Sequence, residues 1–491
     1  MLFRSGVQLS YQGGDVGLNA YASIPLAEKR FVPWFDEPAP FTKRTERPSL
    51  EQWQRNPKYA RKLARALTQQ GFNDIELSLE GRTLLVSLSH SRISFISRAV
   101  GRTARTVLSL GPMAMDSIKI TYTLSRLPVV TYVFKDAYAL QYYFEGLMSL
   151  AQLQKSIDIT FATREYAKVL ADAAIRDLAV RDSTDPFIEP QLGRPLLFGA
   201  KRGPLSRIFF APFNLNIFFN DPSGALRFDL FSVLGYSTPV ARRLFFNSAV
   251  RFTLAEDVSE VEQQSNSLLP HVRSDVALYK QGSDIRLLEL LLNKYYLFGE
   301  RVYGRLSAGY YEEMFAGAGG QILYMPRWGK WAFDVSVDWV KQRDPDDAFG
   351  FIDYSVLTAL AAFHYRFPKF GIATTVRAGR FLAKDDGVRF EVKRRFRSGV
   401  EVGGWFTVTD IDDITSPGSP DDPYRDKGIF LSVPFNILVG RDTRATANFS
   451  LAPWTRDVGQ MVNSPGDLYG LMERSLMLDN PEYGPLVDLD K

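Results

Sequence analysis

The sequence predicts a mainly β protein: a transmembrane antiparallel up-and-down β-barrel of about 12 to 14 strands, preceded by a small periplasmic α+β domain with an αββ repeat and by a β-hairpin. Two observations lead to this prediction. Within a barrel unit at residues 205–480, residues 207–454 alternate between apolar and polar side chains over segments of about ten residues or more, whereas strands of soluble proteins peak near five or six. Residues 48–156 follow a helical period instead.

The first residues predict a β-hairpin, followed by a linker. Segments 6–12 and 16–24 alternate on either side of a Gly-Gly-Asp turn, within a unit at residues 1–30. A lone hairpin is not independently stable, so we expect it to need further strands as partners. No signal peptide follows Met1, so the chain is either cytosolic or lacks its original N-terminus, and the barrel pattern favours the second. The Pro-rich residues 31–47 predict a linker.

Residues 48–156 predict an α+β domain built from a repeated helix–strand–strand unit. Asn56 caps a helix with Pro57 at its first position and Gly71 at its end. Strands at 75–79 and 84–88 follow, and then a helix at 96–107, strands at 118–122 and 129–134, and a helix at 135–147. Basic residues line both repeat helices, as solvated faces or as surfaces for an anionic partner: Lys58, Arg61, Lys62, Arg65, Arg98, Arg102 and Arg105. Residues 157–204 predict a partly helical connector.

The barrel prediction depends on alternation and on where the long connections fall. In residues 330–341, Trp331, Phe333 and Val335 alternate with polar side chains that include Asp334 and Asp338. A soluble sandwich also alternates, but charged residues in one phase and terminal aromatics in the other are typical of membrane barrels. Counted from Arg207, long connections follow the third, seventh and eleventh strands (256–283, 342–354 and 410–427), while the even-numbered connections are short. This sorting places the first strand's start, and the α+β domain, in the periplasm.

The strand count is uneven. We identify 12 strands and a thirteenth near 443–454. Because bacterial single-chain barrels have even numbers, either one strand is misassigned or residues 468–477 supply a fourteenth. No stretch reaches the roughly 20 apolar residues that a spanning helix needs, so a helical membrane protein is not expected.

The polar phase predicts the lining of the barrel lumen, which is our candidate polymer path. Its members are Arg227, Asp229, Arg243, Arg251, Arg301, Arg305, Asp334, Asp338, Arg377, Arg389, Glu391, Arg395 and Glu401. With Tyr303 and Trp405 in the same phase, these residues could line a path for sugars, in which aromatic rings stack on the sugar and Arg groups meet acidic residues. Alternatively, the charges only satisfy one another, and the sequence leaves both interpretations open.

Composition argues against an enzyme. The 491 residues contain no Cys and three His, which excludes thiol chemistry and leaves little imidazole chemistry. His90 and His271 have no Ser or Asp partner at an informative spacing. His364 lies in the polar phase of its strand with Arg366, so we expect it to face the lumen as a hydrogen-bonding side chain rather than a base. The six Asp of loop 410–426 lack the order of a calcium loop, so we predict no catalytic residue, metal site or cofactor. A formal net charge of +4 over 491 residues is too small to indicate nucleic-acid binding.

Several segments together resemble one family. Residues 302–310 (VYGRLSAGY), 312–320 (EEMFAGAGG), 322–326 (ILYMP), 339–343 (WVKQR), 32–38 (VPWFDEP) and 71–75 (GFNDI) are similar to the YjbH family of outer-membrane proteins. The resemblance implies a lipoprotein-like or secreted precursor encoded with exopolysaccharide genes, with two barrels around a periplasmic α/β part. This chain would then be an N-terminally truncated member, in which residues 1–30 are the terminal hairpin, the remnant of a first barrel. The terminal Asp490-Lys491 departs from the aromatic end of many barrels.

The resemblance and the pattern give one functional expectation. We expect an outer-membrane β-barrel protein with a periplasmic domain, in contact with outer-membrane lipid, that takes part in exopolysaccharide or capsule export or assembly. Its partners would be exopolysaccharide and other polysaccharide secretion proteins. A general porin and a barrel enzyme acting on lipid or polysaccharide are the alternatives.

Overall fold

The computed structural model describes most of the chain. The described residues are 5–12, 15–22, 38, 41, 46–160, 196–201, 206–221, 224–241, 243–263, 265–299, 301–326, 329–367, 370–396, 398–415, 418–454, 457–476 and 489–490. The predicted linker at 31–47 and connector at 157–204 therefore lie largely outside them. Strands β1 (Ser5–Gln12) and β2 (Asp15–Ala22) pair antiparallel as a separate two-stranded sheet, which confirms the predicted hairpin.

The α+β domain contains one six-stranded sheet in the order β7-β6-β5-β4-β3-β8. Its strands are β3 (Phe72–Glu80), β4 (Thr83–His90), β5 (Ser117–Leu124), β6 (Leu127–Phe134), β7 (Ile157–Thr160) and β8 (Leu196–Lys201). The pair β4/β5 is parallel and the others are antiparallel, as an αββ repeat requires when a helix crosses over between the two hairpins. Strands β7 and β8 come from the segment expected to be a connector, so that segment contributes both edges of the sheet.

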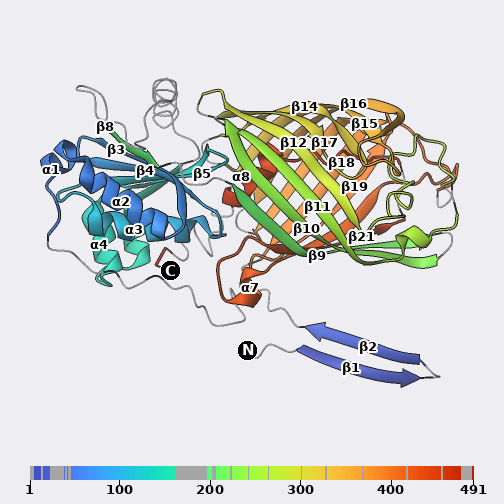
Figure 1. Ribbon diagram of the computed structural model, residues 1–491, viewed down its shortest axis with the longest axis horizontal. Coiled ribbons are helices and arrows are strands. Elements are labelled where there is room, and N and C mark those ends of the chain that lie inside the picture. The colour runs from blue at the N-terminus through green and yellow to red at the C-terminus, as the bar shows by residue number, and fades with distance from the viewer. Residues whose placement is uncertain are drawn as a thin grey trace.

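Helices pack on this sheet and form its core. They are α1 (Leu50–Arg55), α2 (Pro57–Gln69), α3 (Ile96–Leu110), α4 (Ala137–Phe144) and α5 (Leu150–Leu153) (Figure 1). The side-chain oxygen of Asn56 accepts a hydrogen bond from the Lys58 N–H at 3.0 Å, and Pro57 begins α2 as predicted. Apolar residues at helical spacing place Leu63 and Val100 in a fully buried core with Tyr132.

The second unit is a closed barrel of 13 strands (Figure 1). The strands are β9 (Arg207–Asp221), β10 (Gly224–Ala241), β11 (Leu244–Glu256), β12 (Ile285–Leu297), β13 (Val302–Tyr310), β14 (Phe315–Tyr324), β15 (Trp331–Arg343), β16 (Phe351–Phe367), β17 (Ile372–Arg380), β18 (Asp386–Arg395), β19 (Glu401–Thr409), β20 (Lys427–Pro434) and β21 (Thr446–Pro453). Consecutive strands pair antiparallel, and β21 closes on β9 in parallel. The predicted up-and-down barrel is confirmed.

The suggestion of a fourteenth strand is wrong. Residues Leu468–Leu476 form helix α8, because Leu468 and Met472 are spaced by four and are both fully buried. The expectation of an even number therefore fails, since the parallel β21/β9 pair closes an odd number of strands.

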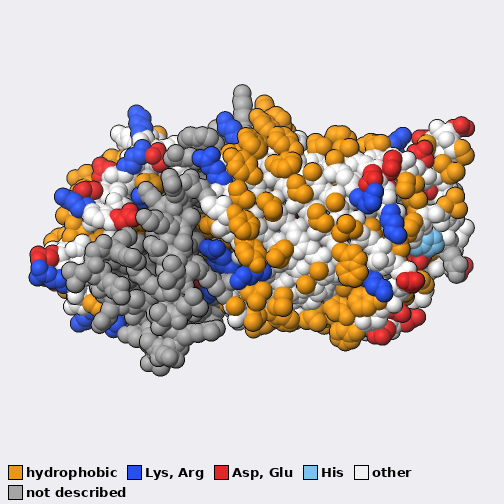
Figure 2. Space-filling model, turned by 90° about the horizontal axis from the view of Figure 1, so that it is seen from above, with side chains coloured by type: hydrophobic (Ala, Val, Ile, Leu, Met, Phe, Trp, Pro, Cys, Tyr) orange, Lys and Arg blue, Asp and Glu red, His pale blue; other side chains and the backbone are white. Residues whose placement is uncertain are grey.

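The barrel turns its apolar side chains outward. Along β15, Trp331, Phe333 and Trp339 are 38%, 43% and 50% exposed, whereas Asp334 and Asp338 are 4% and 3% exposed. Figure 2 shows the result as a band of apolar side chains around the barrel. This arrangement is the reverse of a water-exposed sheet, which buries its apolar face.

None of the described helices combines the length and the apolar character that crossing a membrane requires.

The connections define two barrel ends. The loop-side mouth carries the connections 257–284, 344–350 and 410–426, which lie at the same mouth as predicted, but the prediction that every connection at the other mouth is short is wrong. The domain-side mouth carries the others and faces the α+β domain (Figure 1). One domain-side connection is longer than predicted: residues 435–445 include α7 (Asn436–Val439), because this segment contacts the α+β domain.

Candidate functional site

The barrel lumen contains the protein's own C-terminal segment. After β21 the chain turns inward at the loop-side mouth, and residues 457–476 contact the inner faces of β13, β14, β15 and β18. Helix α8 lies at the domain-side end of the lumen, where it contacts β6 of the α+β domain (Figure 1). We call residues 457–476 the lumenal segment.

Arg305 holds the middle of the lumenal segment. Its guanidinium donates to the Ser464 and Pro465 carbonyl oxygens at 3.1 and 2.9 Å and to Ser464 Oγ at 2.7 Å. Ser464 Oγ in turn lies 3.3 Å from Asp338 Oδ1. Two residues of the predicted lumenal lining are therefore engaged by the chain itself.

Gln321 anchors the start of α8. Its Nε2 donates to Asp334 at 3.0 Å and to Asp467 at 2.6 Å, and its Oε1 accepts the Leu468 N–H at 2.7 Å. This last contact satisfies one of the N–H groups that a helix leaves unpaired at its first turn.

His364 extends the same network beside α8. Its ring nitrogens lie 2.6 Å from Asp334 Oδ2 and 2.9 Å from Thr375 Oγ1, and its ring stacks on Tyr469. His364 is completely buried, so the structure places it as a hydrogen-bonding residue between the barrel wall and the lumenal segment.

Charged contacts hold both ends of the lumenal segment. Near the domain-side mouth, Lys393 Nζ lies 2.5 Å from Glu473 Oε2. At the loop-side mouth, Asp457 is completely buried and accepts the Arg273 and Ser274 N–H groups at 2.8 and 3.0 Å. Asp385 accepts the Gly459 N–H at 2.7 Å, while burial raises the pKa of its carboxyl group.

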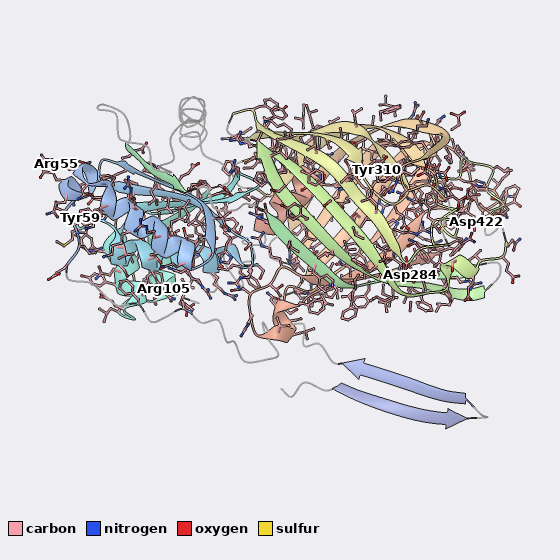
Figure 3. The ribbon with its side chains drawn as sticks, viewed as in Figure 1. Arg55, Tyr59, Arg105, Asp284, Tyr310 and Asp422 are labelled. Atoms are coloured by element: carbon pink, nitrogen blue, oxygen red, sulfur yellow. The ribbon has the colours of Figure 1, made fainter. Side chains whose placement is uncertain are left out.

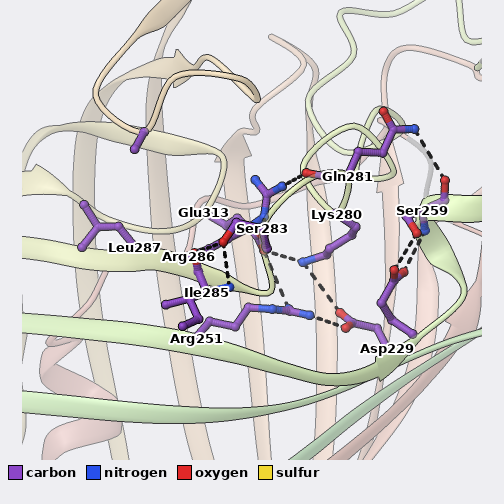
Figure 4. Close-up of polar contacts among 12 residues, drawn as sticks. Asp229, Arg251, Ser259, Lys280, Gln281, Ser283, Ile285, Arg286, Leu287 and Glu313 are labelled. Atoms are coloured by element: carbon purple, nitrogen blue, oxygen red, sulfur yellow. Dashed lines mark hydrogen bonds and ion pairs between the residues drawn. The ribbon is translucent and has the colours of Figure 1, made fainter.

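The connection 257–284 folds over the loop-side mouth and is fixed by an ion-pair cluster (Figure 4). Lys280 Nζ lies 2.5 Å from Glu313 and 3.7 Å from Asp229, and Asp229 also pairs with Arg251. Arg251 is 3% exposed and its guanidinium lies over the Phe231 ring. These contacts hold the connection 257–284 to β10, to β11 and to the connection 311–314 at the loop-side mouth.

The remaining predicted lining residues divide into paired residues and turn residues. Arg377 pairs with Glu391 at 3.6 Å, Arg389 with Asp426 at 2.9 Å, and Arg395 with Glu401 at 2.8 Å. Arg227 donates to the Asp257 carbonyl oxygen at 3.1 Å. Arg243 and Arg301 lie in the turns before β11 and β13 at the domain-side mouth rather than on strands, and Arg243 has a positive φ of 52°.

The two aromatic residues expected to line a sugar path are engaged by contacts within the protein. Tyr303 is completely buried and its hydroxyl donates to the Pro128 carbonyl oxygen in β6, so it packs against the α+β domain. Trp405 Nε1 donates to Asp426 at 2.9 Å, and its ring lies beneath Arg389.

The sequence interpretation missed Gln321, Lys393 and the lumenal segment as a whole, whereas His364 is the lumenal hydrogen-bonding residue that was expected. Lys393 stands in the same alternating phase as Arg389 and Glu391, so the alternation contained the signal for it. Gln321 lies in a Gly- and Ala-rich strand with little polar pattern, and its role depends on a residue 146 positions away. Among the described residues, no group of three or more His, Asp or Glu could hold a metal ion.

The α+β domain and the barrel meet through a buried arginine face on α3. Arg98 and Arg102 are 1% and 8% exposed and lie 2.5 and 3.8 Å from Asp442 in the connection 435–445. Arg444 from that connection donates to the Ile93 carbonyl oxygen and to Tyr122 Oη. The solvated interpretation of this basic stripe is therefore wrong for α3, since its anionic partner is the barrel of the same chain.

His90 is a structural residue beside this interface. Its Nδ1 accepts the Arg92 and Ile93 N–H groups at 3.1 and 3.0 Å, and its Nε2 lies 3.1 Å from the Gln70 carbonyl oxygen. Burial, together with the nearby Arg444, lowers the pKa of His90 to about 4 despite that carbonyl contact. The ring is neutral at neutral pH.

The fold and site define a class: closed β-barrels whose lumen holds a segment of the same chain and whose one mouth is covered by an α+β domain. The chain belongs to the YjbH family, since the family model described as "Exopolysaccharide biosynthesis protein YbjH" matches residues 3–474. The resemblance seen in the sequence is thereby confirmed.

Individual proteins are similar over shorter stretches. The "Uncharacterized lipoprotein YjbH" of Escherichia coli (strain K12) is 37% identical over 211 residues, which are 42% of this chain and 29% of that relative. Among solved structures, a Salmonella typhi OmpF complex with daunomycin covers 48% of this chain and 87% of its own, with 11% identity and a TM-score of 0.30. A loop-deletion mutant of OmpT from Vibrio cholerae covers 46% of this chain and 87% of its own, with 9% identity and a TM-score of 0.24.

Proposed function

We propose that this protein is an outer-membrane β-barrel component of exopolysaccharide export or assembly, with its α+β domain in the periplasm, and that it is not an enzyme. The observation that carries the proposal is the lumenal segment, which fills a charged lumen through exchangeable polar contacts. Membership of an exopolysaccharide biosynthesis family supports the polymer as the substrate.

The outer surface supports the membrane location. The exposed apolar side chains of the strands form a continuous band (Figure 2), and aromatic residues lie near both of its edges. Trp331 and Phe367 lie at the domain-side edge, and Trp339 and Phe351 lie toward the loop side, all between 38% and 50% exposed. Aromatic girdles of this kind flank the lipid-facing band of outer-membrane barrels.

The contacts inside the lumen support a path that opens only when the lumenal segment moves, rather than a permanently open path. Arg305, Gln321 and Lys393 hold the lumenal segment by hydrogen bonds and an ion pair, with no covalent link. Sugar hydroxyl and carboxylate groups offer the same chemistry, so a polymer can replace these contacts as the segment leaves. Export would then require the segment to move, and the polymer would meet Arg305 and Lys393 as it passes.

Planar-bilayer conductance tests the gated path. We expect low current from the full chain and a large increase from a variant lacking residues 457–476, because the deletion empties the lumen. A double variant that replaces two outward residues, Val335→Thr and Val337→Thr, serves as the control and should stay closed. Large constitutive and unselective currents from the intact chain would instead favour the general porin.

Protease accessibility tests the topology. In intact cells that produce the full-length protein, cleavage should occur first within the exposed loops at 344–350 and 410–426, while the α+β domain should be cut only after the outer membrane is opened. Cleavage of the α+β domain in intact cells would place it outside and contradict the proposal.

The enzyme alternative has its own test. His271 lies 2.9 Å from Asp275 in the loop-side connection, and His364 pairs with Asp334. If the protein is not an enzyme, His271→Gln and His364→Gln leave the chain length and composition of the secreted polymer unchanged. A change in polymer processing by a stably folded variant would support an enzyme.

A further inference from the structure

The two barrel ends carry opposite charge. The domain-side connections 242–243, 298–301, 325–330, 368–371, 396–400 and 435–445 contain nine basic and two acidic residues, a net charge of +7. The loop-side connections 222–223, 257–284, 311–314, 344–350, 381–385 and 410–426 contain four basic and 17 acidic residues, a net charge of −13. The connection 435–445 contacts the α+β domain. The other five domain-side connections still contain seven basic residues and one acidic residue, so that contact does not explain the sorting.

Three exposed cations at the domain-side end of the barrel lie next to apolar side chains. Lys330 precedes the outward-facing Trp331, and the guanidinium of Arg394 lies 4.9 Å from the centroid of the Phe396 ring. Arg441 follows α7, whose Leu438 and Val439 are 40% and 47% exposed. Figure 2 shows Lys and Arg side chains gathered where the apolar band ends toward the α+β domain. Together Lys330, Arg394 and Arg441 form what we call the basic rim.

The cations of the basic rim have no acidic partners among the described residues, whereas an outward-facing arginine at the loop-side end of the barrel has one. Lys330, Arg394 and Arg441 are exposed, and none of them forms an ion pair within the described part of the chain. At the loop side, the outward-facing Arg380 is paired with Asp386 at 3.0 Å. Acidic residues such as Asp284 and Asp422 lie at that end of the molecule (Figure 3).

We infer that the basic rim binds anionic phospholipid headgroups of the leaflet on the domain side of the barrel. The inference rests on the proposed membrane location. Arg394 faces outward, in the same phase as Phe390 and Val392, so its side chain lies against lipid and reaches toward the headgroups. A soluble acidic polymer would not need cations placed at the edge of an apolar band. The unpaired charge and the neighbouring apolar groups match the two parts of a lipid, its phosphate and its acyl chain.

Lipid retention tests the inference on the full chain. The protein is reconstituted into vesicles of phosphatidylcholine mixed with phosphatidylglycerol, extracted with mild detergent, and the lipid that stays bound is quantified by mass spectrometry. We expect enrichment of phosphatidylglycerol at low salt that falls at high salt. The variant Lys330→Gln/Arg394→Gln/Arg441→Gln should lower the phosphatidylglycerol-to-phosphatidylcholine ratio about tenfold or more, since each cation near an anionic surface contributes appreciably.

The matched control removes three loop-side cations, Lys341→Gln/Lys384→Gln/Lys427→Gln, and should retain the enrichment of the unmodified chain. Circular dichroism of each variant checks that the barrel is folded, and the salt dependence of the unmodified chain gives a readout that needs no variant. Equal enrichment in both triple variants would overturn the inference. Displacement of phosphatidylglycerol by soluble polyuronate would also overturn it, because it would show that the basic rim binds an acidic polymer instead. A chain that inserts into vesicles without lipid preference contradicts only this inference, whereas failure to insert into any vesicle contradicts the proposed function as well.

Discussion

Arg98 Nη1 of α3 lies 2.5 Å from Asp442 Oδ1 of the barrel, and both side chains are 1% exposed. The two residues are separated by 344 positions in the sequence. A charge pair removed from water in this way is held by its geometry, because either partner left alone would be a buried unpaired charge. The pair therefore fixes the orientation of the α+β domain on the domain-side mouth.

Asp442→Asn should loosen this interface strongly. Removing one partner of a buried ion pair costs about 3–5 kcal/mol, and urea unfolding of the full chain, with protease sensitivity of the α+β domain, measures the loss. The exposed pair Lys135–Asp158, with side chains 54% and 50% exposed, provides the control. Asp158→Asn should change the free energy of unfolding by less than about 1 kcal/mol. Equal effects from the two variants would show that the Arg98 pair does not hold the domains together.

His90 should make stability depend on pH. Its pKa is lowered from 6.5 to about 4 in the folded chain, so between these values the unfolded state binds more protons than the native state. The free energy of unfolding therefore falls as pH drops from 6.5 to about 4, by about 3 kcal/mol for a shift of this size. Urea midpoints across this range measure the effect. His90→Asn, whose side-chain oxygen can accept the Arg92 and Ile93 N–H groups, should flatten this part of the profile, and an unchanged profile would assign the pH dependence to other groups.

Gln321→Leu should release the lumenal segment. The change removes two donated hydrogen bonds and leaves the buried Leu468 N–H without its acceptor, at a cost of about 1–3 kcal/mol. Since the chain has no Cys, Ser464→Cys provides a single label site. Its maleimide labelling rate should rise in the Gln321→Leu background. Gln141→Leu in α4, remote from the lumen, should leave the rate unchanged, and an equal rise there would indicate general loosening instead.

The effect of Gly101→Ala on the free energy of unfolding should have opposite signs in the full chain and in a shortened chain. A Cβ at Gly101 would meet the Leu489 carbonyl oxygen, so alanine displaces residues 489–490 from α3 and destabilises the full chain. In a chain that ends at residue 476 the same change should stabilise α3 by about 0.5–1 kcal/mol, because alanine favours a helix interior over glycine. Thermal unfolding of the four chains measures the difference. The same sign in both backgrounds would show that the C-terminal residues do not pack on Gly101.

Local patterns predicted the elements because each pattern has its own period. Asn56 and Pro57 mark the start of α2, and the alternation around Asp334 and Asp338 marks an inward phase that the structure contains. The lumenal segment could not be predicted, since its contacts join residues such as Arg305 and Ser464 that lie 159 positions apart. The same limit explains the error for α3: a basic helix face looks identical in sequence whether it meets water or the buried Asp442. Helix α8 was ambiguous because nine residues allow either period.

The parallel contact between β21 and β9 determines where the end of the chain can go. In an up-and-down barrel with an even number of strands, the last strand returns to the mouth at which the first began. Here the thirteenth strand finishes at the opposite mouth from the start of β9. Residues 489–490 nevertheless pack on α3 of the α+β domain, so the chain has to come back across the full height of the barrel. The odd strand number thus starts the C-terminal segment at the mouth far from the α+β domain, and the lumen is the route by which residues 457–476 return toward it.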